Sequence, residues 1–398
     1  MREAHALSSA SLDIERELLL YCAGEAGSVA DMQPLTDMVD RGVNWERLLA
    51  LADAHGLGPL THEALIRLPA HRVPTPVLAR LWVQTVANKR RNHRRAVELL
   101  RLLKVLEAGG IRAIPLKGPV LTAWLYGDLG LRVFGDLDIL VGRDDVLRAR
   151  DVLALEGYRA ASLLRPEDDA AFVAAERQYD FELVHERTGD LVELHWKTNT
   201  EFAIERLDDP QWWFSLATTE LEGQPVRMLN RRETLFSLLI HGSKHLWSRL
   251  NWLVDIARLV PKLDDEDWAW LIREAQKHRC KRRIALGLLL VKDLLRQPLP
   301  RNVESAFCHL ASIERIALHV TVAAFKLGDA GTSVPENLKF DVMLYDTLPQ
   351  RARHLALIAL TPNANAWAEA SASGGHGVAA MLLRWWRLAK KYLFRQTA

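Results

Sequence analysis

The spacing of apolar residues changes twice along this chain of 398 residues. From about residue 11 to residue 107, apolar side chains recur three or four positions apart, which is typical of amphipathic helices. Short β-type runs follow between residues 111 and 196, and helical spacing returns after about residue 230. The pattern predicts an α+β protein, predominantly helical, in which a small sheet unit is embedded between two helical regions.

Prolines and glycines indicate where these regions begin and end. Several prolines between residues 69 and 76 interrupt the first helical region, and a long helix is predicted from Val77 to Glu107, before Gly109 and Gly110. Strands are predicted at residues 111–116 and 137–141, with a hairpin at 178–196 that turns at 188–190. We expect a helical N-terminal region (1–76), an α/β unit (77–225) and a helical C-terminal domain (226–398).

Composition narrows the class of protein and its location. Apolar residues make up 49% of the chain, and the longest apolar run is shorter than the eighteen or so residues of a membrane span. Acidic residues precede the first short apolar patch, which is not the pattern of a signal peptide. The three cysteines lie far apart, as in a reducing cytoplasm. We expect a cytoplasmic protein. Its net charge of +2 predicts no stable DNA binding.

Two aspartates, Asp136 and Asp138, stand out within LKGPVLTAWLYGDLGLRVFGDLDILV, residues 116–141. An acidic-x-acidic triplet alone means little, since 50 acidic residues give roughly six by chance. Here an apolar run follows directly, so both carboxylates lie on one side of a predicted strand. Burying two like charges is costly without a cation between them, and Mg²⁺ prefers such oxygen ligands. The pair predicts a magnesium site; the alternative is an acidic strand end without a ligand.

Lys117 and Gly118 precede the aspartates and suggest a phosphate site. Gly118 permits close backbone approach, and Pro119 suits the first position of a helix whose free N–H groups attract anions. Lys117 adds a positive charge. The alternative is an ordinary strand-turn-helix with a solvated lysine.

Glu193 is the candidate third carboxylate. It lies in the otherwise apolar run VELHW, and its neighbours Val192 and Leu194 resemble core residues, which fixes the direction of its side chain. A solvent-facing position on an edge strand is the alternative. Asp180 and Glu182, on the first arm of the hairpin, are rival candidates.

In this order, the segments resemble the nucleotidyltransferase superfamily that includes DNA polymerase beta and the aminoglycoside nucleotidyltransferases. They are most similar to a poorly characterised bacterial family within it. The resemblance covers roughly residues 40–260 and rests on residues 116–141, 192–196 and 241–259. Pro119 replaces the second small residue of the superfamily motif, and seventeen residues separate Gly118 from Asp136.

The resemblance implies roles for particular residues. Asp136, Asp138 and Glu193 would bind two Mg²⁺ ions, Lys117 and Gly118 would lie against the triphosphate of a nucleotide, and Arg132 would contact phosphate. A helical segment adds three candidates for the nucleotide or acceptor pocket; packing in a helical bundle is the alternative for its histidines. These three residues are His241, Lys244 and His245.

The implied reaction is Mg²⁺-dependent transfer of a nucleoside monophosphate from a nucleoside triphosphate to an acceptor hydroxyl, with release of pyrophosphate. A small molecule, a protein or an RNA end are all open as acceptors. Two other functions are weighed against it. One is a glycosyltransferase with an Asp-x-Asp motif, although the doubly wound half that such enzymes need is not indicated. The other is a non-catalytic nucleotide-binding or toxin–antitoxin type module.

Two basic segments each leave two interpretations open. Residues 89–95, KRRNHRR, are either a contact for RNA or phosphate, or a solvated helix face. Residues 381–398 are predicted to form a basic amphipathic helix, which either rests on an anionic membrane surface or docks on the protein.

Overall fold

A computed structural model describes residues 13–25, 32–161, 165–198, 202, 207, 209–308, 311–325, 334–361 and 367. The chain forms two compact units, each built from separate stretches of sequence. The helical unit comprises Met1–Val97, Lys117–Gly135 and Ala217–Asp346; the sheet unit comprises Glu98–Leu116, Asp136–Leu216 and Thr347–Ala398. The three contiguous domains predicted from the sequence, with boundaries at residues 76 and 225, stay a prediction. The helix predicted at residues 381–398 lies outside the described residues.

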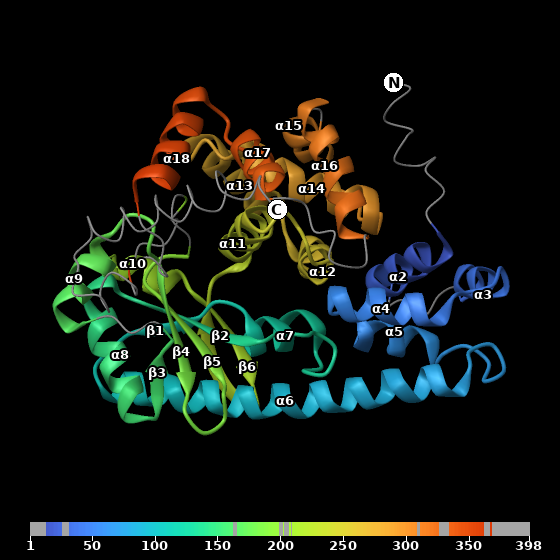
Figure 1. Cartoon of the computed structure of the whole chain (residues 1–398), viewed down its shortest axis with the longest axis horizontal. Helices are drawn as coiled ribbons and strands as arrows, with labels where there is room; N and C mark the ends of the chain where they lie inside the picture. The colour runs from blue at the N-terminus through green and yellow to red at the C-terminus, as the bar shows by residue number, and fades with distance from the viewer. Residues whose placement is uncertain are drawn as a thin grey trace, which may run out of the picture. The chain divides into compact units, whose positions relative to one another are not determined.

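The strands of the sheet unit are drawn in Figure 1. Five of them form one mixed sheet in the order β1-β2-β5-β4-β3. The central pair β2–β5 is parallel, and the other pairs are antiparallel. The predicted strands and hairpin are therefore confirmed, and the α+β class with them. The strands are β1 (Ala113–Pro115), β2 (Asp136–Val141), β3 (Tyr158–Ala160), β4 (Asp180–His185) and β5 (Leu191–His195).

One face of this sheet is apolar and the other is acidic. On the apolar face, Leu137 pairs with Val192 and Ile139 with Leu194, and all four side chains are buried. Because alternate residues point to opposite faces and paired residues share a face, the polar residues of three strands gather on the other side. We call this side the acidic face; it carries Asp136, Asp138, Asp180, Glu182, Glu193 and His195.

The sheet unit also contains short helices, of which η1, α8 and α9 lie between its strands in the sequence. Helix α8 contacts β3 and β5 through a buried side that includes Leu153. An aromatic stack between Phe172 of α9 and Phe181 of β4 adds to the packing, with ring centroids 5.3 Å apart. The helical elements are η1 (Arg143–Asp145), α8 (Val146–Leu155), α9 (Pro166–Ala174), α10 (Pro210–Ser215) and α18 (Leu348–Leu360).

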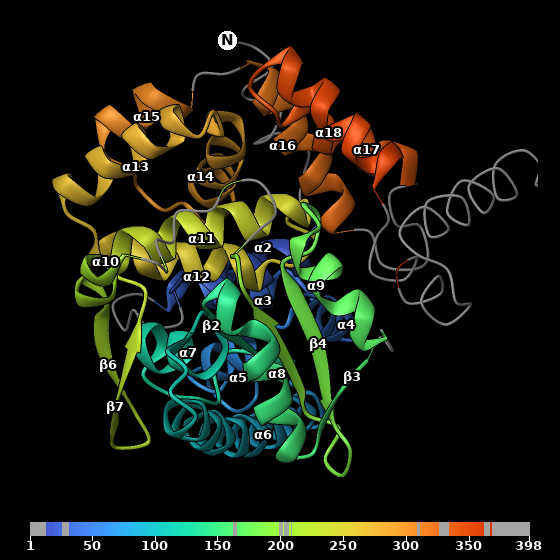
Figure 2. The ribbon, with the colours of Figure 1, turned by 90° about the vertical axis from the view of Figure 1, so that its left-hand side faces the viewer.

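The helical unit is built around α11, α12 and α14, which contact one another (Figure 2). Helix α6 also contributes its first part to this unit, and its last residues belong to the sheet unit. The elements are α2 (Ile14–Glu25), α3 (Gln33–Asp40), α4 (Trp45–His55), α5 (Gly58–Leu65), α6 (Thr75–Ala108), α7 (Gly118–Tyr126), β6 (Ala217–Leu221), β7 (Gln224–Met228), α11 (Arg231–Lys244), α12 (Asn251–Leu259), η2 (Val260–Lys262), α13 (Asp265–Lys277), α14 (Lys281–Leu295), α15 (Arg301–Phe307), α16 (Ala311–Ala324) and α17 (Val334–Met343).

Trp247 fixes the turn between α11 and α12. It is fully buried and has a positive φ of 51°, as has its neighbour Leu246 at 47°. Two glycines make room for the indole: a Cβ at Gly242 would lie 2.2 Å from the ring, and one at Gly287 would lie 2.5 Å from it. Bulkier residues there would push the indole out of place.

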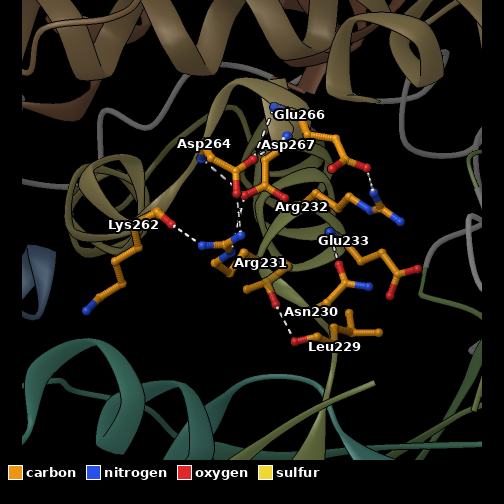
Figure 3. A network of polar contacts seen from close by, with 10 residues as sticks. Leu229, Asn230, Arg231, Arg232, Glu233, Lys262, Asp264, Glu266 and Asp267 are labelled. Carbon is orange, nitrogen blue, oxygen red and sulfur yellow. Dashed lines mark hydrogen bonds and ion pairs between the residues drawn. The ribbon is translucent and has the colours of Figure 1, made fainter. Parts of the chain in front are cut away.

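A polar network ties the start of α11 to the start of α13 (Figure 3). Asn230 caps α11 by accepting a hydrogen bond from the Glu233 N–H, at 3.1 Å. Arg231 donates to the Lys262 carbonyl at 3.0 Å and to Asp264 at 2.6 Å. Asp264 is in turn the cap of α13. These bonds fix the first turn of α11, the helix that carries His241 near its other end.

No single helix of the described residues has both the length and the apolar composition to cross a membrane. The bent pair Arg301–Phe307 and Ser312–Ala324 meets both measures when its two helices are taken together.

Candidate active site

The acidic face of the sheet brings Asp138, Glu193 and His195 together. Asp138 and Glu193 are register partners on the parallel strands β2 and β5, and His195 follows Glu193 on the same side of β5. The Nε2 atom of His195 lies 3.1 Å from an Asp138 carboxylate oxygen and 3.3 Å from a Glu193 oxygen. Asp138 is 3% exposed and His195 is 4% exposed. The imidazole therefore bridges a buried carboxylate and a partly exposed one, since the Glu193 side chain is 24% exposed.

The charge balance of this site favours a protonated imidazole. Burial of His195 opposes protonation, but its hydrogen bonds to Asp138 and Glu193, together with the charges of Asp138 and Asp180, outweigh it and raise the pKa of His195 to about 9. Tyr179 stacks on the ring, with centroids 5.9 Å apart. Burial, and then the nearby carboxylates, raise the pKa of the Tyr179 phenol, so this hydroxyl stays neutral.

The same atoms could hold a metal ion. One ligand atom from each of Asp138, Glu193 and His195 lies within 4.8 Å of the others. Asp136, half-buried, is on the same face two residues before Asp138. Glu182 also shares this face as the register partner of Glu193, but it is exposed. The ligand atoms that lie together thus come from two of the predicted carboxylates, Asp138 and Glu193, and from an imidazole, which suits a divalent cation; Asp136 shares their face of the sheet.

Lys117 and Gly118 open α7 as predicted. Gly118 is buried with a positive φ of 58°, a backbone conformation that favours glycine, and a proline lies in the first turn. Gly118 also accepts a hydrogen bond from the Thr122 hydroxyl through its carbonyl, at 2.8 Å. The first turn of α7 therefore starts at the predicted place, with the Lys117 side chain at the N-terminal end of the helix.

The end of α11 gathers a group of basic and aromatic side chains. The Lys117 amine lies 3.4 Å from Nδ1 of His241. The rings of His241 and His245 are 4.8 Å apart, and Trp252 of α12 lies 5.2 Å and 5.4 Å from them. Lys244 and His245 are exposed. The structure thus brings Lys117 and His241, which are 124 residues apart in the sequence, into one group.

Arg132, predicted to contact phosphate, has a different partner in the structure. Its guanidinium forms a two-pronged ion pair with Asp255 of α12, at 2.8 and 2.9 Å. Arg132 is 5% exposed and Asp255 is fully buried. The Tyr126 hydroxyl donates to the same carboxylate at 2.7 Å, and Arg258 lies over the Tyr126 ring. The geometry of Arg132 is that of an internal anchor, because both prongs of its fork face Asp255.

Side chains of α6 hold the loop that contains Arg132, residues 127–135. Asn88 donates to the carbonyls of Gly130 and Arg132, at 2.8 and 3.1 Å. Asn92 donates to the carbonyls of Leu129 and Arg132, at 2.6 and 2.8 Å. Two basic residues of the 89–95 stretch also contact the loop: Lys89 pairs with Asp128, and Arg95 donates to the Phe134 carbonyl. Asp136 follows this loop directly in the sequence.

Three of these residues were given no role from the sequence. His195 follows Glu193 by two residues in β5, so strand alternation puts both side chains on one face, and this was the available signal. Asn88 and Asn92 are buried and lie one helical turn apart on α6. Two amides on a buried helix face need partners, and that requirement could have indicated a loop packed against them.

Comparison with known proteins gave a match to a protein family. Residues 41–296 match the model of a family described as uncharacterised nucleotidyltransferase. The search of curated proteins gave no match. A crystal structure of an antigenic nucleotidyltransferase-like protein from Paracoccidioides brasiliensis aligns with 54% of this chain and 96% of that chain, at 17% identity and a TM-score of 0.29.

Proposed function

This chain belongs to the uncharacterised nucleotidyltransferase family and is an enzyme of nucleotidyl transfer, and from that premise we propose its reaction. It transfers a nucleoside monophosphate from a nucleoside triphosphate to an acceptor hydroxyl, in a reaction that depends on Mg²⁺. One observation carries the proposal: the parallel pairing of β2 and β5 sets Asp138 beside Glu193, with Asp136 on the same face.

The donor set fits the divalent cations that such a reaction needs. Asp136, Asp138 and Glu193 would hold them, because carboxylate oxygens on one face of a sheet match the hard ligands that Mg²⁺ prefers. The bound cations would neutralise charge on the phosphate oxygens and on the attacking and leaving oxygens. The buried position of Asp138 also fits, since a cation beside it would offset the cost of burying its charge, as the imidazole of His195 does in this structure.

The chain's own residues have three tasks in this proposal. Lys117 and the N-terminal turn of α7 at Gly118 bind the triphosphate, as a cation and free N–H groups do for anions. His241 and its neighbours at the end of α11, Lys244 and His245, line the nucleotide. Glu193 accepts the proton of the acceptor hydroxyl.

The bond changes balance as follows. The acceptor oxygen attacks the α-phosphorus, and the new phosphorus–oxygen bond replaces the bond to the leaving pyrophosphate. Positioning and charge neutralisation supply most of the acceleration in such transfers. Arg132 anchors the loop before Asp136 in this proposal, in place of a direct phosphate contact.

We further propose that the acceptor is a small molecule, a protein or an RNA end, and that the reaction takes place in the cytoplasm. The three cysteines, Cys22, Cys280 and Cys308, are free and buried, which fits a reducing compartment. Contact of residues 381–398 with a membrane surface stays a prediction.

Calorimetry with ATP, GTP, CTP and UTP in the presence of Mg²⁺ tests this proposal. Asp136→Asn/Asp138→Asn should weaken binding of the preferred nucleotide by at least about tenfold, because loss of groups around a metal costs about 10–100-fold in affinity. Glu182→Gln is the matched control, since Glu182 shares the acidic face but is exposed. Its affinity should equal that of the wild type.

A second assay measures the release of pyrophosphate from the preferred nucleotide. Pyrophosphate release should stop in the double aspartate variant and in Glu193→Gln, and it should continue in Glu182→Gln. Equal Mg²⁺-dependent binding by the wild type and the double aspartate variant would remove these carboxylates from the site.

A further inference from the structure

His195 has a position in the acidic face that packing alone does not require. A buried side chain at the end of β5 could be apolar, as Leu140, its register partner on β2, is. Instead the imidazole points its Nε2 atom at two carboxylates, at 3.1 Å from Asp138 and 3.3 Å from Glu193. Tyr179 stacks on the ring at an interplanar angle of 19° and sets its plane.

These separations match those between neighbouring ligands of one metal ion. In octahedral coordination with bonds of about 2.1 Å, adjacent donor atoms lie about 3 Å apart, which is the bond length multiplied by the square root of two. Nε2 lies at about this distance from each of the two carboxylate oxygens, at 3.1 and 3.3 Å, and all three atoms lie within 4.8 Å of one another. A cation could therefore bind all three atoms with small side-chain movements.

We propose that Nε2 of His195 is itself a ligand of the divalent cation, together with Asp138 and Glu193, and that it raises the affinity of this site for Mn²⁺ relative to Mg²⁺, so that Mn²⁺ can serve in place of the Mg²⁺ of the proposed function. The inference rests on the proposed function, because it concerns the same cation site. Imidazole nitrogen suits transition metals, whereas Mg²⁺ is held by oxygen ligands and water. Mn²⁺ accepts carboxylates and imidazole together, so the mixed donor set favours it.

The other groups facing this site are compatible with a cation. Asp180 is the register partner of His195 and adds negative charge, and Asp136 lies on the same face of β2. The burial of Asp138 and His195 limits the number of waters around a bound ion. Mg²⁺ keeps several waters in most protein sites, and this burial adds to the preference for Mn²⁺.

Pulsed electron paramagnetic resonance of the full chain with Mn²⁺ alone tests the inference directly. Nitrogen modulation from a bound imidazole should appear in the wild type and change frequency when histidine is labelled with ¹⁵N. It should disappear in His195→Gln, which puts an amide oxygen near the position of Nε2. His185→Gln is the matched control on the same sheet: His185 lies half-buried at the end of β4, and its variant should keep the signal.

Affinities give a second readout that a purely structural role would not change. The ratio of Mn²⁺ to Mg²⁺ affinity should fall by about tenfold or more in His195→Gln, because its donor set is then all oxygen. Circular dichroism of the variant should match that of the wild type. An unchanged ratio in a folded variant would overturn the inference.

The remaining outcomes separate this inference from the proposed function. If Mn²⁺ binds, is lost in Asp138→Asn and shows no nitrogen modulation, His195 is not a ligand and the carboxylate site stands. If neither Mn²⁺ nor Mg²⁺ binds, alone or with a nucleoside triphosphate, the inference and the proposed function both fail. The measurement with nucleotide uses ¹⁵N-labelled histidine, so base nitrogen is not mistaken for imidazole.

Discussion

Replacement of Asp255 by alanine should destabilise the protein strongly. The carboxylate is fully buried and is the partner of both prongs of Arg132, which is 5% exposed. Its removal leaves a guanidinium buried opposite a cavity, and breaking a buried pair in this way costs about 3–5 kcal/mol. The Tyr126 hydroxyl also loses its acceptor, which adds about 1 kcal/mol. Urea unfolding followed by tryptophan fluorescence measures the loss.

A double variant tests whether the buried charge causes this loss. Arg132→Met/Asp255→Leu removes both charges and fills the space with apolar atoms, so most of the stability should return, as it does when apolar residues replace other buried pairs. Tyr126→Phe removes only the hydroxyl and should cost about 1 kcal/mol. The reasoning is refuted if Asp255→Ala costs less than about 1 kcal/mol, or if the double variant is as unstable as the single one.

The same double variant decides between the two roles of Arg132. If its guanidinium contacted the triphosphate, the variant would lose nucleotide affinity even when it is folded. If it anchors the loop of residues 127–135, the folded variant should bind nucleotide as the wild type does. We expect the second result, because both prongs of the guanidinium face Asp255.

Two further predictions concern packing and pH in the helical unit. Gly242→Ala should lower the free energy of unfolding by about 1–3 kcal/mol, because the added Cβ would lie 2.2 Å from the Trp247 ring. Gly135→Ala is the control: a Cβ there would have no atom within 4 Å, so the same urea assay should show little loss of stability. Burial of His55 lowers the pKa of its imidazole from 6.5 to about 4. The charge of Arg249 acts in the same direction, and a hydrogen bond to the backbone of Ala324 acts in the opposite direction. Below pH 6.5 this imidazole is therefore protonated in the unfolded chain while it stays neutral in the native state. The free energy of unfolding should fall by up to about 3 kcal/mol as the pH drops from 6.5 to 4. Urea midpoints at pH 7 and pH 4.5 should differ less in His55→Gln, and an equal difference would contradict the assignment.

Much of the sheet unit follows from local patterns in the sequence. The strand predicted at residues 137–141 corresponds to β2 (Asp136–Val141), and the hairpin of β4 and β5 was predicted from alternation and turn residues. In the helical unit, the start of α7 at Gly118 was predicted from glycine and proline. The convergence of Asp138 and Glu193 needed more. The two carboxylates converge because β2 pairs in parallel with β5. Local patterns did not predict this pairing; the resemblance to a known family implied that the two carboxylates share one metal site. The family match over residues 41–296 confirms the predicted family, whereas the roles of Asp138 and Glu193, the bacterial origin and the relation to aminoglycoside enzymes stay predictions.

The rest depended on contacts between distant parts of the chain. Asp255 is 123 residues from Arg132, and no local rule gives an arginine a partner at that distance. The basic stretch at residues 89–95 shows the same limit. Composition could not tell that Lys89 and Arg95 contact the loop of residues 127–135 while Arg90, Arg91 and Arg94 are exposed.

Arg132 and His195 illustrate how two buried carboxylates can have different uses. Each carboxylate has a nitrogen partner on a buried side chain: Asp255 has a guanidinium and Asp138 an imidazole. A guanidinium keeps its proton in proteins and has no lone pair to offer, so the pair around Asp255 can only be structural. An imidazole can give up its proton and present the same nitrogen to a metal. On the proposal above, a divalent cation would take the place of the proton between Asp138 and His195, whereas displacement of Arg132 would break a buried ion pair.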